Sequence, residues 1–128
     1  MDNEPICEID GRGTKRWYLD GRRHREDGPA VEMKKGSRFW YINGKRHRED
    51  GPAAEYYHGD KEWYINGKLH RLDGPANVSH SGYKEWWING SKLKDEIQSW
   101  AEENNIDLDN LTHEDKALIK LVWTYYGQ

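Results

Sequence analysis

The chain has 128 residues, of which 34% are hydrophobic and 34% charged, and its formal net charge is −3. This length predicts one domain, or one domain with a short appendage. The single cysteine excludes a disulfide framework and a cysteine-based zinc site within the chain. No apolar run approaches the roughly 20 residues that a membrane span requires. Because the N-terminus is polar and acidic and shows no signal peptide, we expect a cytoplasmic protein.

The charge is unevenly distributed along the chain. Residues 11–94 carry 18 Lys and Arg against 11 Asp and Glu, a net charge of +7. Residues 1–10 carry four acidic and no basic residues, and residues 95–128 carry eight acidic and two basic ones, so the two flanks hold −4 and −6. A basic central segment between acidic flanks bears on the kind of partner that the chain could bind.

A motif recurs every 23 residues through the first two thirds of the chain. An aromatic pair falls at this step four times, at Trp17-Tyr18, Trp40-Tyr41, Trp63-Tyr64 and Trp86-Trp87. The segment His24–Ala30 recurs as His47–Ala53 and as His70–Ala76. A fixed period of this size predicts stacked repeats, in which no unit buries its apolar face alone. A motif copied several times also indicates a scaffold or a multivalent binding surface, since an enzyme usually has one site of unique geometry.

Each unit is predicted to be a β-hairpin followed by a connection. In the second unit, residues 30–34 and 38–42 predict two strands. Asn43-Gly44 predicts a tight turn, because both residues tolerate a positive φ. Asp50-Gly51-Pro52 then ends the regular structure. We therefore expect residues 1–90 to form a single antiparallel meander of about four hairpin repeats.

The period ends at the fourth unit, and residues 91–128 predict a C-terminal helical cap. Apolar residues at helical spacing from Leu93 to Ala101 predict a first helix. Thr112 with Asp115 resembles a capping box, and an apolar stripe after it predicts a second helix. A terminal unit of different sequence is the usual protection for the open edge of a repeat sheet. The expected fold is therefore mainly β, closed by two α-helices.

Alternation along the strands predicts two aromatic rows on opposite faces of the sheet. One row is expected to be buried and consists of Trp17, Trp40, Trp63 and Trp86. The Leu or Ile two residues after each tryptophan is expected to be buried with it. The opposite row consists of Tyr18, Tyr41, Tyr64 and Trp87. A thin sheet does not need a second aromatic row for its own stability. This row is therefore either covered by the connections or offered to a partner.

The repeated His-Arg-x-Asp-Gly-Pro-Ala motif is interpreted as mainly structural. We expect each His to bond to the Asp three residues later and so to fix the connection. The residues concerned are His24, His47, His70, Asp27, Asp50 and Asp73. The glycine is expected to supply a special φ. Equivalent histidines would lie roughly 9–10 Å apart, across two strand spacings, which is too far for ligands that each lie about 2 Å from a shared zinc ion. We expect no metal site and no cofactor.

Basic residues near the motif form a candidate binding surface. Arg25, Arg48 and Arg71 are predicted to pair with the Asp two residues later, with ligand contact as the alternative. The other candidates are Arg22, Arg23, Lys45, Arg46 and Lys68. Cations interleaved with exposed rings suit nucleic acid or a nucleotide, although acidic residues are interspersed. No nucleophile stands beside a base, so we expect no enzyme activity.

The run Asn43-Gly44-Lys45-Arg46-His47, after Trp-Tyr-Ile, resembles a MORN repeat, whose units have an aromatic strand, an Asn-Gly turn, then Lys and His. The match recurs at residues 66–70 and more loosely at 20–24, and it covers roughly residues 6–90. Typical MORN units continue with glycines, whereas this chain continues with Arg-x-Asp-Gly-Pro-Ala. In this it is similar to MORN-like proteins of bacteriophages and large DNA viruses. The resemblance implies a β-hairpin array that acts as a scaffold or an interaction module.

Three functional hypotheses follow from these patterns. The first is a non-enzymatic protein-interaction module, which by analogy with the viral proteins would bind and inhibit a host factor such as a defence component. The second is a binder of nucleic acid or of an anionic nucleotide-like ligand on the basic and aromatic face. The third is a purely structural module, or an antitoxin-like partner such as the resemblance to a bacterial variant implies. The open edge of the first hairpin also suggests a homodimer.

Overall fold

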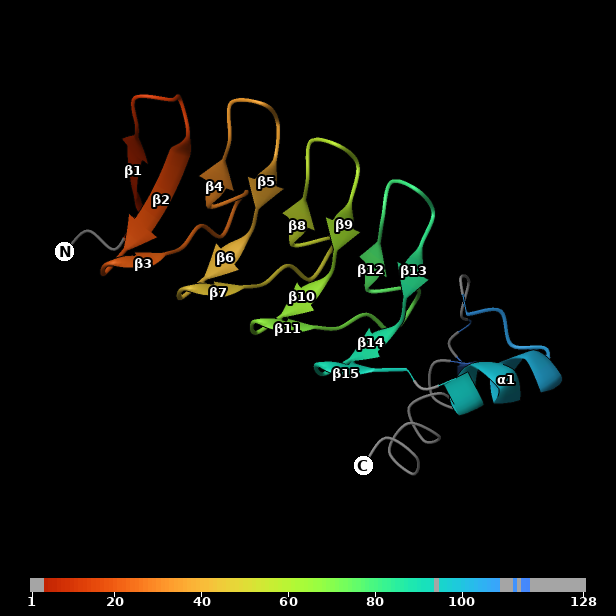
Figure 1. Ribbon diagram of the computed structural model, residues 1–128. Helices are drawn as coiled ribbons and strands as arrows, with labels where there is room; N and C mark the ends of the chain where they lie inside the picture. Colours follow the sequence, from red (N-terminus) through yellow and green to blue (C-terminus); the bar gives the residue numbers. More distant parts are fainter. Residues whose placement is uncertain (1–3, 94, 109–111, 113, 116–128) are drawn as a thin grey trace.

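The computed structural model describes residues 4–93, 95–108, 112, 114 and 115, and it shows a row of β-hairpins that ends at a helix (Figure 1). A nine-stranded antiparallel sheet follows the order β1-β2-β4-β5-β8-β9-β12-β13, with β3 paired to β2. Its strands are β1 (Ile6–Ile9), β2 (Lys15–Leu19), β3 (Arg22–Arg23), β4 (Val31–Glu32), β5 (Arg38–Phe39), β8 (Ala54–Glu55), β9 (Lys61–Glu62), β12 (Asn77–Val78) and β13 (Lys84–Glu85). The predicted mainly β fold with an antiparallel meander is confirmed.

The predicted strand over residues 38–42 is divided in two at Trp40, and the same division recurs in the next two units. Below the main sheet lie three separate hairpins: β6 (Tyr41–Ile42) with β7 (Lys45–Arg46), β10 (Tyr64–Ile65) with β11 (Lys68–Leu69), and β14 (Trp87–Ile88) with β15 (Ser91–Lys92). The N–H of Trp40 donates to the carbonyl of Ala53, and the carbonyl of Trp40 accepts the N–H of His47. Trp40 is therefore the point at which pairing changes from β8 to β7, which corrects the prediction of a single sheet.

The turns of the lower hairpins have the backbone that their sequences predict. Asn43 has a φ of 51° and Gly44 a φ of 80°, and Asn66 and Gly67 have the same two values. Two successive residues with positive φ form the type I′ geometry whose twist matches that of antiparallel strands. Asp20 takes the asparagine's place in the first unit with a φ of 52°. The Asn-Gly prediction is therefore confirmed.

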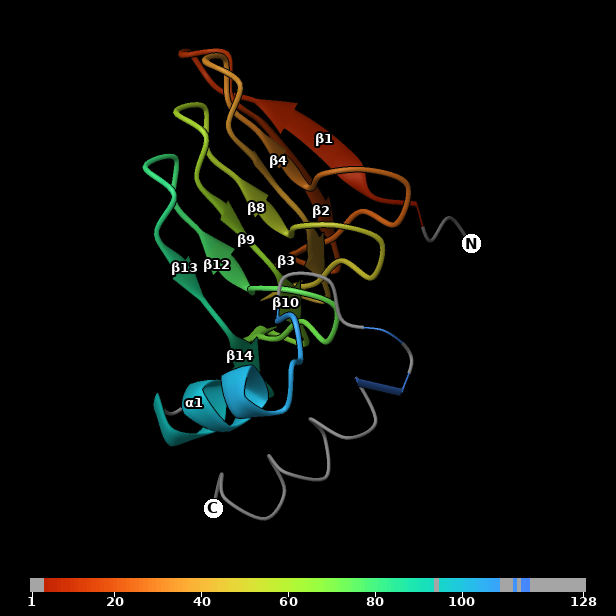
Figure 2. The ribbon, with the colours of Figure 1, turned by 90° about the vertical axis from the view of Figure 1, so that its right-hand side faces the viewer.

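The fully buried positions of the array belong to small side chains, in contrast to the predicted core of tryptophans. Ala30, Ala53 and Ala76 have no exposed surface, and Ala54 is likewise buried. The tryptophan row is only half-buried. The array is one sheet thick (Figures 1 and 2), so water is excluded only where a connection lies directly on the strands. Small alanine side chains occupy these close approaches, and the larger rings reach the surface beside them.

Histidine side chains join neighbouring units, with a partner that the sequence analysis did not predict. The imidazole Nδ1 of His24 accepts the backbone N–H of Asn43 at 3.0 Å. The same bond, at the same length, links His47 to Asn66 and His70 to Asn89. We expected the Asp three residues later as the partner, but the structure gives that carboxylate to the arginine of the motif. Each histidine thus ties its own connection to the turn of the next unit.

Replacing His24 by leucine is expected to lower the free energy of unfolding by about 1–3 kcal/mol, because the part-buried N–H of Asn43 loses its acceptor. Chemical denaturation monitored by tryptophan fluorescence measures the effect. Glu26→Gln is the matched control, since it removes the carboxylate 3.5 Å from His24 Nε2 and leaves the Nδ1 bond intact. Equal midpoints for wild type and His24→Leu would contradict the role assigned to this bond.

The array ends at helix α1 (Asp95–Glu103), which confirms the first of the two predicted helices. α1 lies against the last unit beside β14 (Figures 1 and 2). The chain leaves the helix at Asn105, which has a φ of 56°. Thr112 and Asp115 form the predicted capping box, with the N–H of each bonded to the side chain of the other. The second predicted helix lies otherwise outside the described residues. Among the described residues, no helix combines the length and apolarity needed to cross a membrane.

Candidate functional site

Three grooves recur along the array at the tryptophan row, and we call them the Trp grooves. The floor of each is a tryptophan with the Leu or Ile two residues later, and the walls of the second and third are two successive connections. The floors are Trp17 with Leu19, Trp40 with Ile42, and Trp63 with Ile65. The second and third grooves enclose about 780 and 720 Å³, whereas the first encloses about 480 Å³ because residues 4–5 replace a preceding connection. The repeat therefore produces equivalent binding-sized hollows in register.

An arginine of the connection covers one face of each of these tryptophans. In the second unit, the Arg48 guanidinium carbon lies 3.9 Å from the Trp40 ring centroid. Nε donates to Asp50 at 3.1 Å, and Nη1 donates to the carbonyl of Pro52 at 3.0 Å and to Glu55 at 3.3 Å. Arg25 over Trp17 and Arg71 over Trp63 repeat the 3.9 Å distance. The predicted Arg–Asp pairing is confirmed, and the stacking on tryptophan is an additional contact that the sequence analysis missed.

The glycine of the Asp-Gly-Pro corner leaves room for the guanidinium of this arginine and does not supply a special backbone conformation. Gly51 is not among the glycines with positive φ, which corrects the expectation for this position. A Cβ atom at Gly51 would lie 2.9 Å from Cζ of Arg48, closer than real Cβ contacts allow. Gly28 and Gly74 stand in the same relation to Arg25 and Arg71. Glycine is therefore needed here for the close approach of the guanidinium.

At the fourth unit, the chain covers the equivalent floor with its own C-terminal segment. Trp86 and Ile88 follow in phase, and Leu93 stands where the earlier units have the histidine. Leu93 is buried against Trp86, Ile88 and Leu108. The indole Nε1 of Trp86 donates to the carbonyl of Leu108 at 2.9 Å. Within the part of the chain that the structure describes, no other indole of this row donates to a protein acceptor.

The opposite aromatic row is largely engaged within the protein. Tyr41 and Tyr64 are half-buried on either side of Arg46, whose guanidinium carbon lies 6.0 and 5.4 Å from their ring centroids. Arg46 Nε donates to the Tyr41 hydroxyl at 3.3 Å. Although burial lowers the pKa of Arg46, the bond to Tyr41 and the nearby tyrosines hold it above its usual value. These three candidate residues thus form a stacked internal cluster.

Glu62 extends this cluster on the side of the hairpin tips. Its carboxylate accepts the hydroxyl protons of Tyr56 at 2.8 Å and Tyr64 at 3.4 Å, and lies 3.8 Å from Arg46 Nη1. Burial and the bond to Glu62 raise the pKa of Tyr56 to about 12, and burial with the charge of Glu62 also raises the pKa of Tyr64. Both phenols therefore stay neutral donors at physiological pH, which favours a structural role for this row.

The remaining candidates of the row are also half-buried. Tyr18 lies on β2. The guanidinium carbon of Arg23, one of the basic candidates, is 5.5 Å from the Tyr41 ring centroid. The Trp87 indole donates to Glu85 at 3.3 Å.

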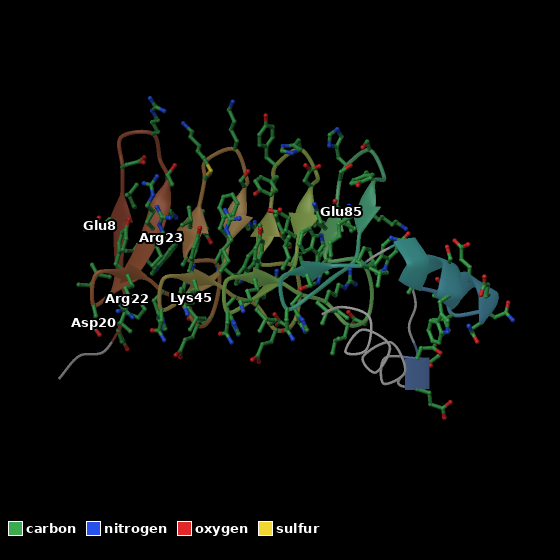
Figure 3. All side chains as sticks on the ribbon, turned by 60° about the horizontal axis from the view of Figure 1, so that its bottom comes forward. Glu8, Asp20, Arg22, Arg23, Lys45 and Glu85 are labelled. Carbon is green, nitrogen blue, oxygen red and sulfur yellow. The ribbon has the colours of Figure 1, made fainter. Side chains whose placement is uncertain are left out.

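Three of the predicted basic residues form an exposed row along the lower turns, which we call the basic edge: Arg22, Lys45 and Lys68. The side chain of each lies beneath the turn glycine of the next unit, 3.6 Å from where a Cβ would stand. Figure 3 shows Arg22 and Lys45 at the same edge of the array. The structure therefore brings these cations together in phase, apart from the Trp grooves.

The outer edge of β1 matches the edge predicted for a homodimer. Among the described strands, β1 pairs with β2 alone. All four of its residues are exposed, and Ile6 and Ile9 are 71% and 64% accessible. This edge therefore presents a backbone ladder and two apolar side chains to a second chain.

A cluster outside the predicted set lies at two neighbouring hairpin tips. Asp60 accepts the backbone N–H of His80 at 2.7 Å, and its two oxygens lie 2.9 Å from His80 Nδ1 and 3.1 Å from His58 Nε2. The bonds from His80, followed by that from His58, lower the pKa of Asp60 to about 2. The sequence analysis compared only histidines in phase at 23 residues, and His80 follows His58 by 22. The predicted adjacency of successive tips was the signal that could have found this cluster.

Comparison of the chain with protein-family models, with curated proteins and with solved structures finds no match.

Proposed function

We propose that this chain is a non-enzymatic protein-interaction module, built on MORN-like repeats, that binds a peptide segment of its partner along the Trp grooves. The observation that supports this function is the covered floor of the fourth unit. There an apolar side chain, Leu93, packs on Trp86 and Ile88, and the carbonyl of Leu108 accepts the indole proton. Within the described residues, the first three units leave the equivalent indole without a protein acceptor and the equivalent apolar floor as an open groove. The host factor that the sequence suggested as partner stays a prediction.

The spacing of the grooves favours a peptide in the polyproline II conformation. β2, β5 and β9, which contain or directly precede successive tryptophans of the row, lie two positions apart in the sheet, which corresponds to about 9.6 Å. A polyproline II helix has three residues per turn and a rise of about 3.1 Å, so it repeats a side chain on one side every ~9.3 Å. A β-strand places residues three apart on opposite faces. The proposed ligand therefore carries Pro or Leu at every third position, with carbonyls that accept the indole protons.

The charges of the groove walls favour basic residues between these anchors. The guanidinium of each wall arginine is already paired within its own connection. The carboxylates beside it project into solvent, since the side chains of Glu26, Asp27, Glu49 and Asp50 are 82–88% exposed. Lys or Arg in the spacer positions of the peptide would meet these acidic rims. The proposed partner segment is thus both proline- or leucine-rich and basic.

Labelled peptides of about ten residues test this function, because that length spans three turns of polyproline II. Peptides with Pro or Leu at every third position and Lys between them are compared with peptides of the same composition that carry the anchors at every second position. Fluorescence anisotropy is expected to show at least about tenfold tighter binding of the period-three series, since 1.4 kcal/mol corresponds to a factor of ten. Equal affinity of the two series would count against the grooves as the binding surface.

Glu49→Arg is the groove variant for the same measurement, because Glu49 lines both the second and the third groove. Reversing its charge and lengthening its side chain is expected to weaken binding of the period-three peptide at least about tenfold. Glu103→Arg makes the same change at an exposed position of α1 and should bind as the wild type does. If Glu103→Arg weakens peptide binding and Glu49→Arg does not, the interface lies on the cap.

The basic edge supports a second candidate function, the binding of an anionic ligand. Arg22, Lys45 and Lys68 are exposed cations at the spacing of the units, as a phosphate backbone or a polyanion requires. Binding of this kind weakens steeply with salt, whereas binding at an apolar groove does so less. An oligonucleotide that binds at low salt and is released by Lys45→Glu would favour this function over the first.

A further inference from the structure

Two hairpin tips bring three potential metal ligands to one point on the surface. His58 and Asp60 stand in the tip between β8 and β9, and His80 stands in the tip between β12 and β13. One ligand atom from each, the two ring nitrogens and a carboxylate oxygen, lie within 4.8 Å of one another. The two imidazoles meet edge to face, with ring centroids 5.5 Å apart. Both rings point a nitrogen at the same carboxylate.

The preceding pair of tips shows that the fold does not require this set of residues. Ser37 occupies the position of Asp60 one unit earlier, and its hydroxyl accepts the N–H of Tyr57 at 2.9 Å. Asp60 makes the equivalent bond to the N–H of His80. A serine is therefore sufficient to join neighbouring tips. The carboxylate and the two imidazoles are additional to that task, and they occur together at one pair of tips among the described residues.

The chemistry of the three donors suits zinc. Two imidazole nitrogens and one carboxylate oxygen are borderline ligands that bind Zn²⁺ at about 2.0–2.2 Å, and a tetrahedral site with such bonds holds its ligand atoms roughly 3.3 Å apart. The present separations of 2.9 and 3.1 Å between Asp60 and the ring nitrogens differ little from that value. An incoming ion would require the carboxylate to move outward and the most distant of the three donor atoms, which all lie within 4.8 Å of one another, to approach to this spacing.

From this geometry we propose that His58, Asp60 and His80 form a zinc-binding site that clamps the two hairpin tips together. The ion would take the place of the hydrogen bonds that now link the three side chains, and each neutral imidazole would carry its proton on the ring nitrogen that faces away from the ion. Three protein ligands leave one tetrahedral position open to water or to a side chain of a partner. Because the ion binds both tips only when they are adjacent, it stabilises the folded array by mass action.

Titration of the full chain with Zn²⁺ tests the site. Isothermal titration calorimetry is expected to show one ion per chain, and thermal unfolding should shift upward with added Zn²⁺ and return to its starting value with a chelator. Asp60→Asn keeps an oxygen that can accept the N–H of His80, so the tips stay joined, but binding should weaken at least about tenfold with the loss of the charged ligand. Glu103→Gln makes the same change from carboxylate to amide at an exposed position of α1 and should leave zinc binding unchanged.

The repeat also allows the site to be rebuilt at the preceding pair of hairpin tips. Lys35, Ser37 and Tyr57 are the residues 23 positions before His58, Asp60 and His80. The triple variant Lys35→His, Ser37→Asp and Tyr57→His should raise the stoichiometry from one ion to two, and a value that stays at one would show that tip geometry does not supply the site. Absence of saturable binding by the wild type, or binding that survives both Asp60→Asn and His58→Gln, would overturn the proposal. Neither result would affect the peptide-binding function, which uses other residues.

Discussion

Replacing Arg48 by alanine is expected to lower the free energy of unfolding by about 2–4 kcal/mol, one of the two largest effects predicted for this chain. A hydrogen bond to a charged group contributes about 1.5–3 kcal/mol, and a cation–π contact contributes about 0.5–2 kcal/mol. Arg48 makes both kinds of contact, to Asp50, to the carbonyl of Pro52 and to the ring of Trp40. Denaturant titration compared with the wild type measures the loss.

Arg48→Lys and Gly51→Ala separate the parts of this arrangement. Lysine keeps the charge but not the planar fork, so it should recover less than half of the lost stability. Alanine at position 51 places a methyl group 2.9 Å from the guanidinium carbon and should destabilise the wild type. The same change should lower the free energy of unfolding only slightly once Arg48 is absent, because the two residues act as one contact. Additive effects in the double variant would contradict the reason given for the glycine.

Removal of residues 93–128 is expected to have the other large effect. Burial of a large apolar side chain contributes about 1.5–3 kcal/mol, so exposure of Trp86 and Ile88 should cost roughly 3–6 kcal/mol. The truncated chain should also associate, since it presents an apolar floor next to the open end of a sheet. Light scattering after size exclusion, together with thermal unfolding, measures both consequences.

Leu108→Asp in the full chain provides the matched variant for the truncation. It keeps the rest of the cap but places a charge against Leu93. It should therefore lower the unfolding midpoint in the same direction, by a smaller amount. A truncated protein that remains monomeric and unfolds at the wild-type midpoint would show that the C-terminal segment is not a cap.

The features that the sequence predicted correctly are those whose partners lie within a few residues. The Asn43-Gly44 turn needs only two residues that accept a positive φ. The Arg48–Asp50 pair joins residues two positions apart, and the Thr112–Asp115 box joins residues three apart. The helix of residues 95–103 follows from its own apolar spacing. The 23-residue step then predicted side-by-side hairpins, because the apolar faces of identical units can all be buried only when each unit lies against another unit of the same kind.

By itself, therefore, the sequence determined the hairpin unit, its turns and the antiparallel order of its strands. Tertiary structure alone decided that His24 accepts the N–H of Asn43, which tryptophans form groove floors, and that His58 and His80 meet at Asp60. Each of these depends on the lateral position of an adjacent unit about 20 residues away, which no local pattern specifies. Burial, likewise, depends on what lies over a face: within the described residues, the C-terminal segment covers the floor of the fourth unit and leaves open grooves at the first three.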